Sequence, residues 1–168
     1  MEIEQIFTKI TGSFNVCKKI EQLKFQEKKV SNSTQEVSEG WKFIHDLAAD
    51  AKWAPGLREI FDYRDLGIKM GTNGDYVAHL IRHNGKEMKD AVQHWHVHDC
   101  EFQFVLVLNG WATFEWEGEG VRTIRKGDAI NQIPGIRHRE IACSDDYEVL
   151  EIVSPADFKT RIVEAPAA

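Results

Sequence analysis

Three histidines, His94, His96 and His98, alternate along one short segment of this chain. Side chains two residues apart on a β-strand point to the same face, so a strand here directs all three imidazoles to one side. A buried imidazole needs a hydrogen-bond partner, and a bound metal ion satisfies a ring nitrogen directly. One histidine in such a place is usually structural, but three on one face favour a metal site. Imidazole suits zinc, iron, nickel and copper.

The residues around these histidines resemble the first sequence motif of the cupin superfamily. That motif is His-x-His, three or four residues, Glu or Gln, six residues, and Gly. The chain has His96 and His98, then four residues, Gln103, six residues and Gly110. Both the residue types and the spacing agree with the motif.

A second register of the same motif competes with the first. It would use His94, His96 and Glu101, and it would require a glycine at the position that Leu108 occupies. Gly110 therefore favours the later register. In that register His94 lies one step further along the same strand face, as a pocket residue.

The second cupin motif also has a counterpart. It is Gly, five residues, Pro-x-Gly-x-x-His, and an Asn four positions after the His. Gly127, Gly135 and His138 keep this spacing, whereas the proline is displaced to Pro134 and the last position holds Ala142. The departures concern the turn and leave the histidine in place.

The resemblance implies an all-β fold: a cupin double-stranded β-helix, or jelly-roll barrel, which spans roughly residues 57–163. It implies one divalent transition metal ion (Fe, Mn, Zn, Ni or Cu) bound by His96, His98, Gln103 and His138. We expect Gln103 on the next strand and His138 on a strand across the barrel. Glutamine in place of the more usual glutamate removes one negative charge, so the metal should be more Lewis acidic. Gln103 could equally be a weak ligand or no ligand.

The elements that position these residues are short strands. From about residue 57 the chain consists of short apolar runs bounded by turn residues such as Asn84–Gly85 and Asn109–Gly110. This texture is typical of a β-sandwich or barrel. The predicted strands are 58–63, 75–83, 91–98, 102–108, 112–116, 120–125, 129–133, 138–142 and 147–153.

The first part of the chain has a different character. It is rich in Lys, Glu and Gln, and some of its apolar residues recur at helical spacing. Those that share one predicted helix face are Val37, Trp41, Ile44 and Ala48. We therefore divide the chain into a helical N-terminal extension, 1–55, and a cupin β-barrel domain, 56–168. The extension is expected to pack as a lid on the barrel or on another subunit.

Two glutamates are candidate catalytic residues. Glu140 lies two residues after His138 on the same strand face, where a carboxylate facing a metal cavity can act as a general base. It could also be an exposed strand residue, or it could accept a hydrogen bond from a ligand histidine. Glu151 shares a potentially inward face with Val149 and Val153 and has the same alternatives.

Several other residues are candidates for the pocket. His79 is placed on the opposite sheet, and Trp116 is expected to fill the barrel more than to stack on a ligand. Arg82 and Arg137 are candidates for an anionic substrate, although arginines at such positions are more often solvated or paired. The predicted pocket residues are therefore His79, Arg82, His94 and Trp116.

Composition limits the partners. The 168 residues carry a net charge of −6 without a basic block, which argues against nucleic acid and anionic membranes. The 3 cysteines are widely spaced and form no CxxC, so they indicate free thiols in a reducing compartment. No signal peptide and no apolar stretch of about 20 residues is evident, so a cytoplasmic protein is expected. The resemblance to cupins favours a homodimer.

The resemblance to cupins implies a metal-dependent enzyme of dioxygenase, isomerase or lyase type, which we expect to act on a small polar or anionic metabolite. The alternative is a non-catalytic cupin that binds or senses a small ligand, because one fold hosts many chemistries. An inward general base in a roomy, polar, open cavity would favour the enzyme. A narrow, apolar, sealed barrel would favour binding.

Overall fold

The computed structural model describes residues 39–56, 58–87 and 93–167. The chain divides into two units, and apart from Glu39 the described residues belong to the second, Gly40–Ala168. The helices predicted before residue 39 lie outside the described residues, as does the start of the strand predicted at 91–98. In the described part of the chain, no helix is long and apolar enough to span a bilayer.

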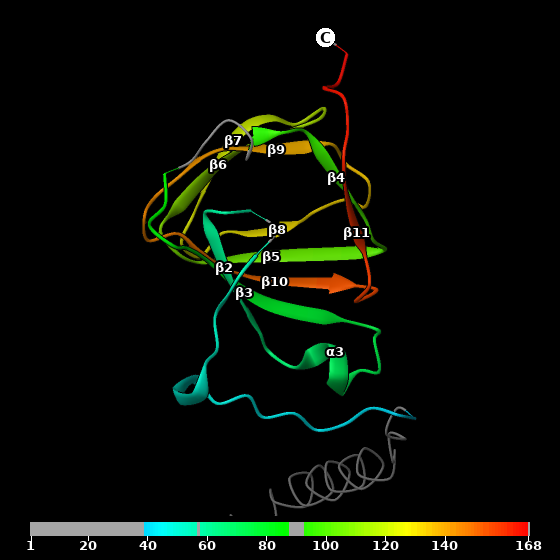
Figure 1. Cartoon of the computed structure of the whole chain (residues 1–168). Helices are drawn as coiled ribbons and strands as arrows, with labels where there is room; N and C mark the ends of the chain where they lie inside the picture. The colour runs from blue at the N-terminus through cyan, green and yellow to red at the C-terminus, as the bar shows by residue number, and fades with distance from the viewer. Residues whose placement is uncertain (1–38, 57, 88–92, 168) are drawn as a thin grey trace, which may run out of the picture. The chain divides into compact units, whose positions relative to one another are not determined.

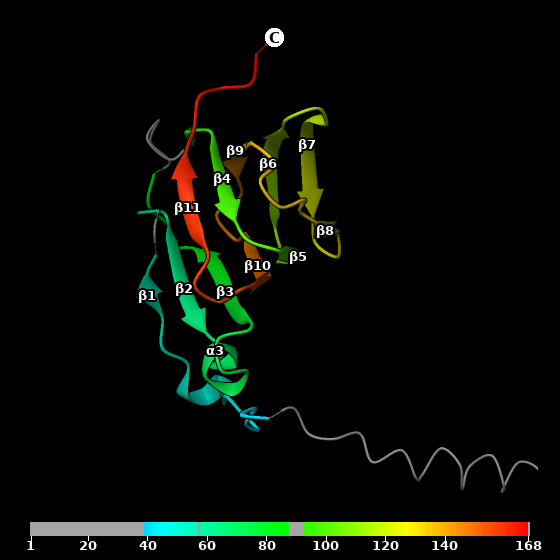
Figure 2. The ribbon, with the colours of Figure 1, turned by 90° about the vertical axis from the view of Figure 1, so that its right-hand side faces the viewer.

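Two antiparallel sheets make up this second unit (Figure 1). The six-stranded sheet has, in order, β1 (Ala54–Pro55), β2 (Phe61–Asp65), β3 (Val77–His83), β10 (Glu148–Ser154), β5 (Phe102–Asn109) and β8 (Ala129–Asn131). The five-stranded sheet has β11 (Lys159–Ile162), β4 (His96–Asp99), β9 (His138–Cys143), β6 (Trp111–Trp116) and β7 (Gly120–Arg125). Figure 2 shows β4, β9, β6 and β7 in one sheet, apart from β2 and β3 in the other.

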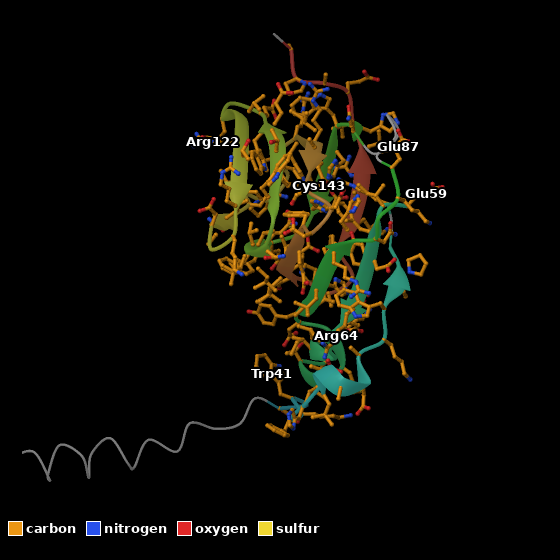
Figure 3. The ribbon with its side chains drawn as sticks, turned by 90° about the vertical axis from the view of Figure 1, so that its left-hand side faces the viewer. Trp41, Glu59, Arg64, Glu87, Arg122 and Cys143 are labelled. Atoms are coloured by element: carbon orange, nitrogen blue, oxygen red, sulfur yellow. The ribbon has the colours of Figure 1, made fainter. Side chains whose placement is uncertain are left out.

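The core lies between the sheets because their strands alternate in side-chain polarity. On β5, Gln103 and Val107 are buried, whereas Phe102 is exposed on the opposite strand face. Figure 3 shows Cys143 among the side chains between the sheets and Arg122 pointing outward from β7. The buried apolar cluster comprises Ile60, Phe61, Ile81, Val107, Ala112, Trp116, Ile124, Tyr147 and Val149.

The turn between β5 and β6 depends on Gly110. Its φ is +65°, in the left-handed region that side chains rarely adopt. A Cβ here would also lie 2.8 Å from the backbone nitrogen of Tyr147 and 2.3 Å from Ser144 Oγ. Gly110, which selected the motif register, is therefore required for two reasons: its backbone conformation, and the close approach of the turn between β9 and β10.

Most of the predicted strands are confirmed, with shifts of one to three residues at their ends. The strand predicted for 91–98 is wrong at its start, because residues 93–95 are not in a strand and β4 begins at His96. The sequence reasoning missed β1 and β11, which are short and lie at sheet edges, where little apolar alternation is needed.

The predicted helix through Trp41, Ile44 and Ala48 is wrong in its described part. Residues 41–47 have no regular structure, and only a short 3-10 helix, η2 (Ala48–Asp50), follows. Tertiary contacts override the helical spacing here. The backbone nitrogen of Lys42 donates to the Gly71 carbonyl at 2.7 Å, at the end of the short helix α3 (Ile68–Gly71).

Candidate metal centre

Three histidines converge inside the barrel. His96 and His98 stand on β4, and His138 is the direct cross-strand neighbour of His96 on β9. The ring centroids of His96 and His138 are 4.1 Å apart, and His98 lies 5.2 Å from His96 and 5.1 Å from His138. One nitrogen from each ring lies within 4.8 Å of the others. His138 thus comes from the neighbouring strand of the same sheet, which corrects the predicted position across the barrel.

Hydrogen bonds fix which ring nitrogen His96 and His138 present. His96 Nδ1 donates to the His94 carbonyl at 2.9 Å, and His138 Nδ1 donates to the Ile136 carbonyl at 3.0 Å. His98 Nδ1 lies 3.0 Å from Thr160 Oγ1 on β11. A proton on Nδ1 of His96 and of His138 leaves a lone pair on each Nε2, the arrangement found in metal-binding histidines, whereas the Thr160 hydroxyl can donate to His98 Nδ1 or accept from it.

The environment keeps all three rings neutral. Burial lowers the pKa of His138 to about 4. Burial, together with the neighbouring His138 and Arg58, lowers the pKa of His98 to about 3 and that of His96 to about 2. Neutral imidazole is the form that binds metal. The donor set therefore fits a divalent transition metal, and these three histidines are the residues that would hold it.

Gln103 belongs to a chain of hydrogen bonds. Trp116 Nε1 donates to Gln132 Oε1 at 3.0 Å, and Gln132 Nε2 donates to Gln103 Oε1 at 2.9 Å. Gln103 Nε2 in turn donates to Glu151 Oε1 at 2.8 Å. Because Trp116 can only donate, its bond fixes the orientation of both amides. Gln103 reaches the site from β5, in the sheet opposite the histidines.

The same amide chain touches the histidine cluster. Gln132 Nε2 lies 3.2 Å from His138 Nε2 as well as 2.9 Å from Gln103 Oε1. A carbonyl oxygen has two lone pairs, so Gln103 Oε1 retains one after accepting from Gln132. Gln103 as a fourth ligand remains a prediction. Sequence reasoning missed Gln132, which lies just after β8 at a position that the second motif leaves unspecified.

Glu140 is the predicted base. In the structure it forms an ion pair with Arg58, which sequence reasoning missed. The Glu140 carboxylate is 1% exposed, and Arg58 Nη1 donates to its Oε2 at 2.5 Å. Arg58 Nη2 also donates to His96 Nε2 at 2.8 Å. Glu140 Oε1 has no nitrogen or oxygen partner among the described residues. Burial raises the pKa of Glu140 to about 7, against the opposing effects of Arg58 and the Cys143 thiol.

These groups line one cavity of about 170 Å³. Burial raises the pKa of Glu151, against the opposing hydrogen bond from Gln103 and the charge of Arg58. The metal-facing wall is polar, and the rest of the cavity is largely apolar. The polar lining residues are His96, His98, Gln103, Gln132, His138, Glu140 and Glu151, together with Arg58 and Thr160.

The predicted pocket residues divide into two groups. His79 and Trp116 line the cavity, and burial lowers the pKa of His79. His94 is exposed and Arg82 stacks its guanidinium over the Trp53 ring at 3.8 Å, so neither lines the cavity. His94 is displaced because β4 begins only at His96, so its side chain does not continue the strand face. It contributes its backbone carbonyl alone.

Solved structures resemble the described unit at low sequence identity. The polyketide cyclase RemF from Streptomyces resistomycificus has a TM-score of 0.55 at 16% identity, over 74% of this chain and 88% of that one. An RmlC-like cupin from Shewanella frigidimarina has a TM-score of 0.53 at 18% identity, over 70% and 96%. The iron(II) form of HppE has a TM-score of 0.53 at 11% identity, over 66% and 60%.

No protein-family model matches the sequence, and no curated protein matches it. At these identities the solved structures bear on the fold alone.

Proposed function

From the cupin fold of this chain we propose a metal-dependent enzyme of dioxygenase, isomerase or lyase type that acts on a small anionic metabolite. The histidine cluster is the observation that carries the proposal. One nitrogen from each of the three neutral rings lies within 4.8 Å of the others. Arg58 and Gln132 lie within hydrogen-bond distance of two of these nitrogens, and a divalent metal ion could bind all three rings at once.

His96, His98 and His138 would hold the metal, with Gln103 as the fourth ligand. The metal would supply Lewis acidity or redox chemistry to a bound oxygen group. The RemF name describes a cyclase and the HppE structure holds iron(II), so this fold carries both an enzyme and a metal in proteins of similar architecture.

Proton transfer is the role we propose for the two glutamates. Glu140 has a pKa of about 7, near the value at which a carboxyl group serves best as a base or acid at neutral pH. Glu151 faces the same cavity and holds the Gln103 amide. In this proposal Glu140 exchanges a proton with the substrate, and Glu151 orients Gln103.

The cavity limits the substrate. A volume of about 170 Å³ is below the range of roughly 300–1,000 Å³ that drug-sized ligands occupy. The substrate should therefore be a small molecule, and the polar wall with Arg58 favours an anion. We also propose a homodimer, as the resemblance to cupins implied, and a cytoplasmic location, as the sequence composition indicated.

Metal content is the first test. Protein purified without chelator or affinity tag would be analysed for bound metals, beside the double variant His96→Ala/His138→Ala. We expect near-stoichiometric metal in the wild type and loss in the variant. Equal absence of metal in both, with no rise in Tm on metal addition, would sink the proposal.

Catalysis needs a separate test. The metal-loaded protein would be incubated with a panel of small carboxylic acids, and consumption would be followed by NMR beside Glu140→Gln. Turnover in the wild type that falls at least about tenfold in the variant supports the assigned base. Saturable binding without turnover of any compound would favour the non-catalytic binding protein instead.

A further inference from the structure

We propose that Arg58 is the anion-binding residue of this site and that metal binding releases it for that task. The inference rests on the proposed metal site. It commits to a substrate whose carboxylate binds the metal and the Arg58 guanidinium together. The observation behind it is that one guanidinium nitrogen occupies the lone pair that a metal would need.

The contacts of Arg58 are divided between its two terminal nitrogens. Nη1 donates to Glu140 Oε2 at 2.5 Å, and Nη2 donates to His96 Nε2 at 2.8 Å. His96 Nδ1 is already used by the His94 carbonyl. The Nε2 lone pair is therefore the one electron pair that His96 can offer, and Arg58 and a metal ion compete for it.

Metal binding would displace Arg58 from the His96 Nε2 lone pair. When His96 Nε2 binds a metal, Nη2 loses its acceptor and the guanidinium meets a second positive charge nearby. Nη1 keeps its bond to Glu140, whose side chain is 1% exposed and packed in place. Arg58 thus remains tethered beside the metal with a free N–H donor.

A free guanidinium donor beside a metal ion selects for anions. Carboxylates bind arginine strongly because charged hydrogen bonds are about twice as strong as neutral ones. Of the arginines, only Arg58 lines the cavity within the described residues. Arg82, one of the two arginines considered for this role from the sequence, stacks on Trp53 and does not line the cavity.

The proposal makes two opposite predictions for one substitution, Arg58→Met. Cobalt(II) should bind the variant about tenfold or more tightly, because a charged hydrogen bond that blocks His96 is gone. Oxalate, the probe for a small carboxylate, should bind the cobalt-loaded variant about tenfold or more weakly, because its arginine partner is gone. A purely structural arginine would not move the two affinities in opposite directions.

Cobalt titrations followed by visible absorption, and then oxalate titrations of the cobalt-loaded protein, provide the measurements. Arg82→Met is the matched control and should leave both affinities unchanged. Because Arg58→Met leaves the Glu140 carboxylate buried without its cation, the double variant Arg58→Met/Glu140→Gln repeats the test with both charges removed. Both variants are expected to give the same two shifts.

Unchanged or weaker cobalt binding in the two variants would overturn the inference, as would unchanged oxalate affinity, while the metal site itself would stand. Wild-type protein and Arg82→Met that bind no cobalt at all would overturn the proposed function, and the inference with it.

Discussion

The three clustered imidazoles share one physical constraint: a positive charge on any of them is unfavourable, because the rings are buried. Burial, with a smaller contribution from the Arg58 charge, lowers the pKa of His138 to about 4, and burial with repulsion from His138 and Arg58 lowers the pKa of His98 to about 3 and of His96 to about 2. In an unfolded chain the pKa of histidine is about 6.5. In the folded protein, protons therefore compete for these nitrogens only in acid.

The pH dependence of metal affinity tests this constraint. Because each folded-state pKa is lowered, the rings stay neutral as the pH falls through 6.5, and metal binding is lost only as the pH approaches about 4. We expect the zinc affinity of the folded protein to change less than about tenfold between pH 8 and 5.5. Competition with a chelator of known proton affinity gives the measurement. A steep loss beginning near pH 6.5 would show that the rings titrate as exposed histidines do.

Gln132 is a positioning residue that acts through its neighbours. Its amide accepts from Trp116 and donates to Gln103, and it also lies beside His138. Gln132→Ala should lower zinc affinity by about 10- to 100-fold, as the loss of such supporting hydrogen bonds does in metal sites. Asn131→Ala, at the adjacent exposed position of β8, is the matched control. Equal zinc affinities in the two variants would contradict the assigned role.

The sequence identifies single residues well only where a motif surrounds them. The motif spacing predicted the three clustered histidines and placed Gln103 on the next strand, where it is buried. Arg58 has no such signal, because it lies in an irregular segment just before β2 and enters the site through tertiary structure alone. His94 is the opposite case, a residue that was predicted for the pocket but does not line it. Its spacing from His96 fits a strand, but the strand begins only at His96.

At the scale of elements, the turn between β5 and β6 connects the two sheets. Its glycine, Gly110, has φ +65° and no room for a Cβ beside Tyr147. Gly118, in the turn between β6 and β7, has φ +76° but nothing within 4 Å of the position that a Cβ would take. The two glycines thus share a backbone conformation and differ in available space.

Alanine substitution separates these two effects. Gly118→Ala should destabilise the protein by about 1–2 kcal/mol, the cost of a left-handed backbone. Gly110→Ala adds a clash with backbone atoms and should cost at least about 3 kcal/mol. Chemical denaturation followed by tryptophan fluorescence gives both free energies of unfolding. Similar losses of unfolding free energy in the two variants would mean that the turn around Gly110 relaxes easily. Backbone conformation alone would then explain the glycine at position 110.

The strands were predictable from sequence because turn residues mark their ends, whereas the segment before β1 was not. Trp41 and Ile44 follow helical spacing, yet their contacts are tertiary. Trp41 makes an edge contact with Tyr76 and donates to Asp75 at 2.9 Å, and the Ile44 side chain lies against Gly71. Helical spacing therefore misled here, because Trp41 stays 43% exposed and Ile44 is only half-buried, so the spacing records no buried helix face.

At the scale of the whole unit, the site joins the two sheets. All three histidines stand on the five-stranded sheet, and Gln103 and Glu151 face them from β5 and β10 of the six-stranded sheet. A metal bound by histidines alone would connect β4 and β9, which already pair. Only coordination by Gln103 would let the metal connect one sheet to the other.

Metal-dependent stability distinguishes these two arrangements. A ligand that binds only the folded state adds RT ln(1 + [L]/Kd) to the free energy of unfolding, or about 1.4 kcal/mol per tenfold rise in metal above Kd. When the free energy of unfolding is plotted against the logarithm of metal concentration, the slope gives the number of sites. The concentration at which the rise begins gives the affinity, and we call it the offset. Gln103→Ala should keep the slope and shift the offset to higher zinc concentration, whereas His96→Ala/His138→Ala should remove the dependence. Because Gln103→Ala also leaves Gln132 and Glu151 without a partner, the comparison uses only the increment that zinc adds. An unshifted offset would show that the histidines alone hold the metal and that the sheets are joined by packing and the amide chain.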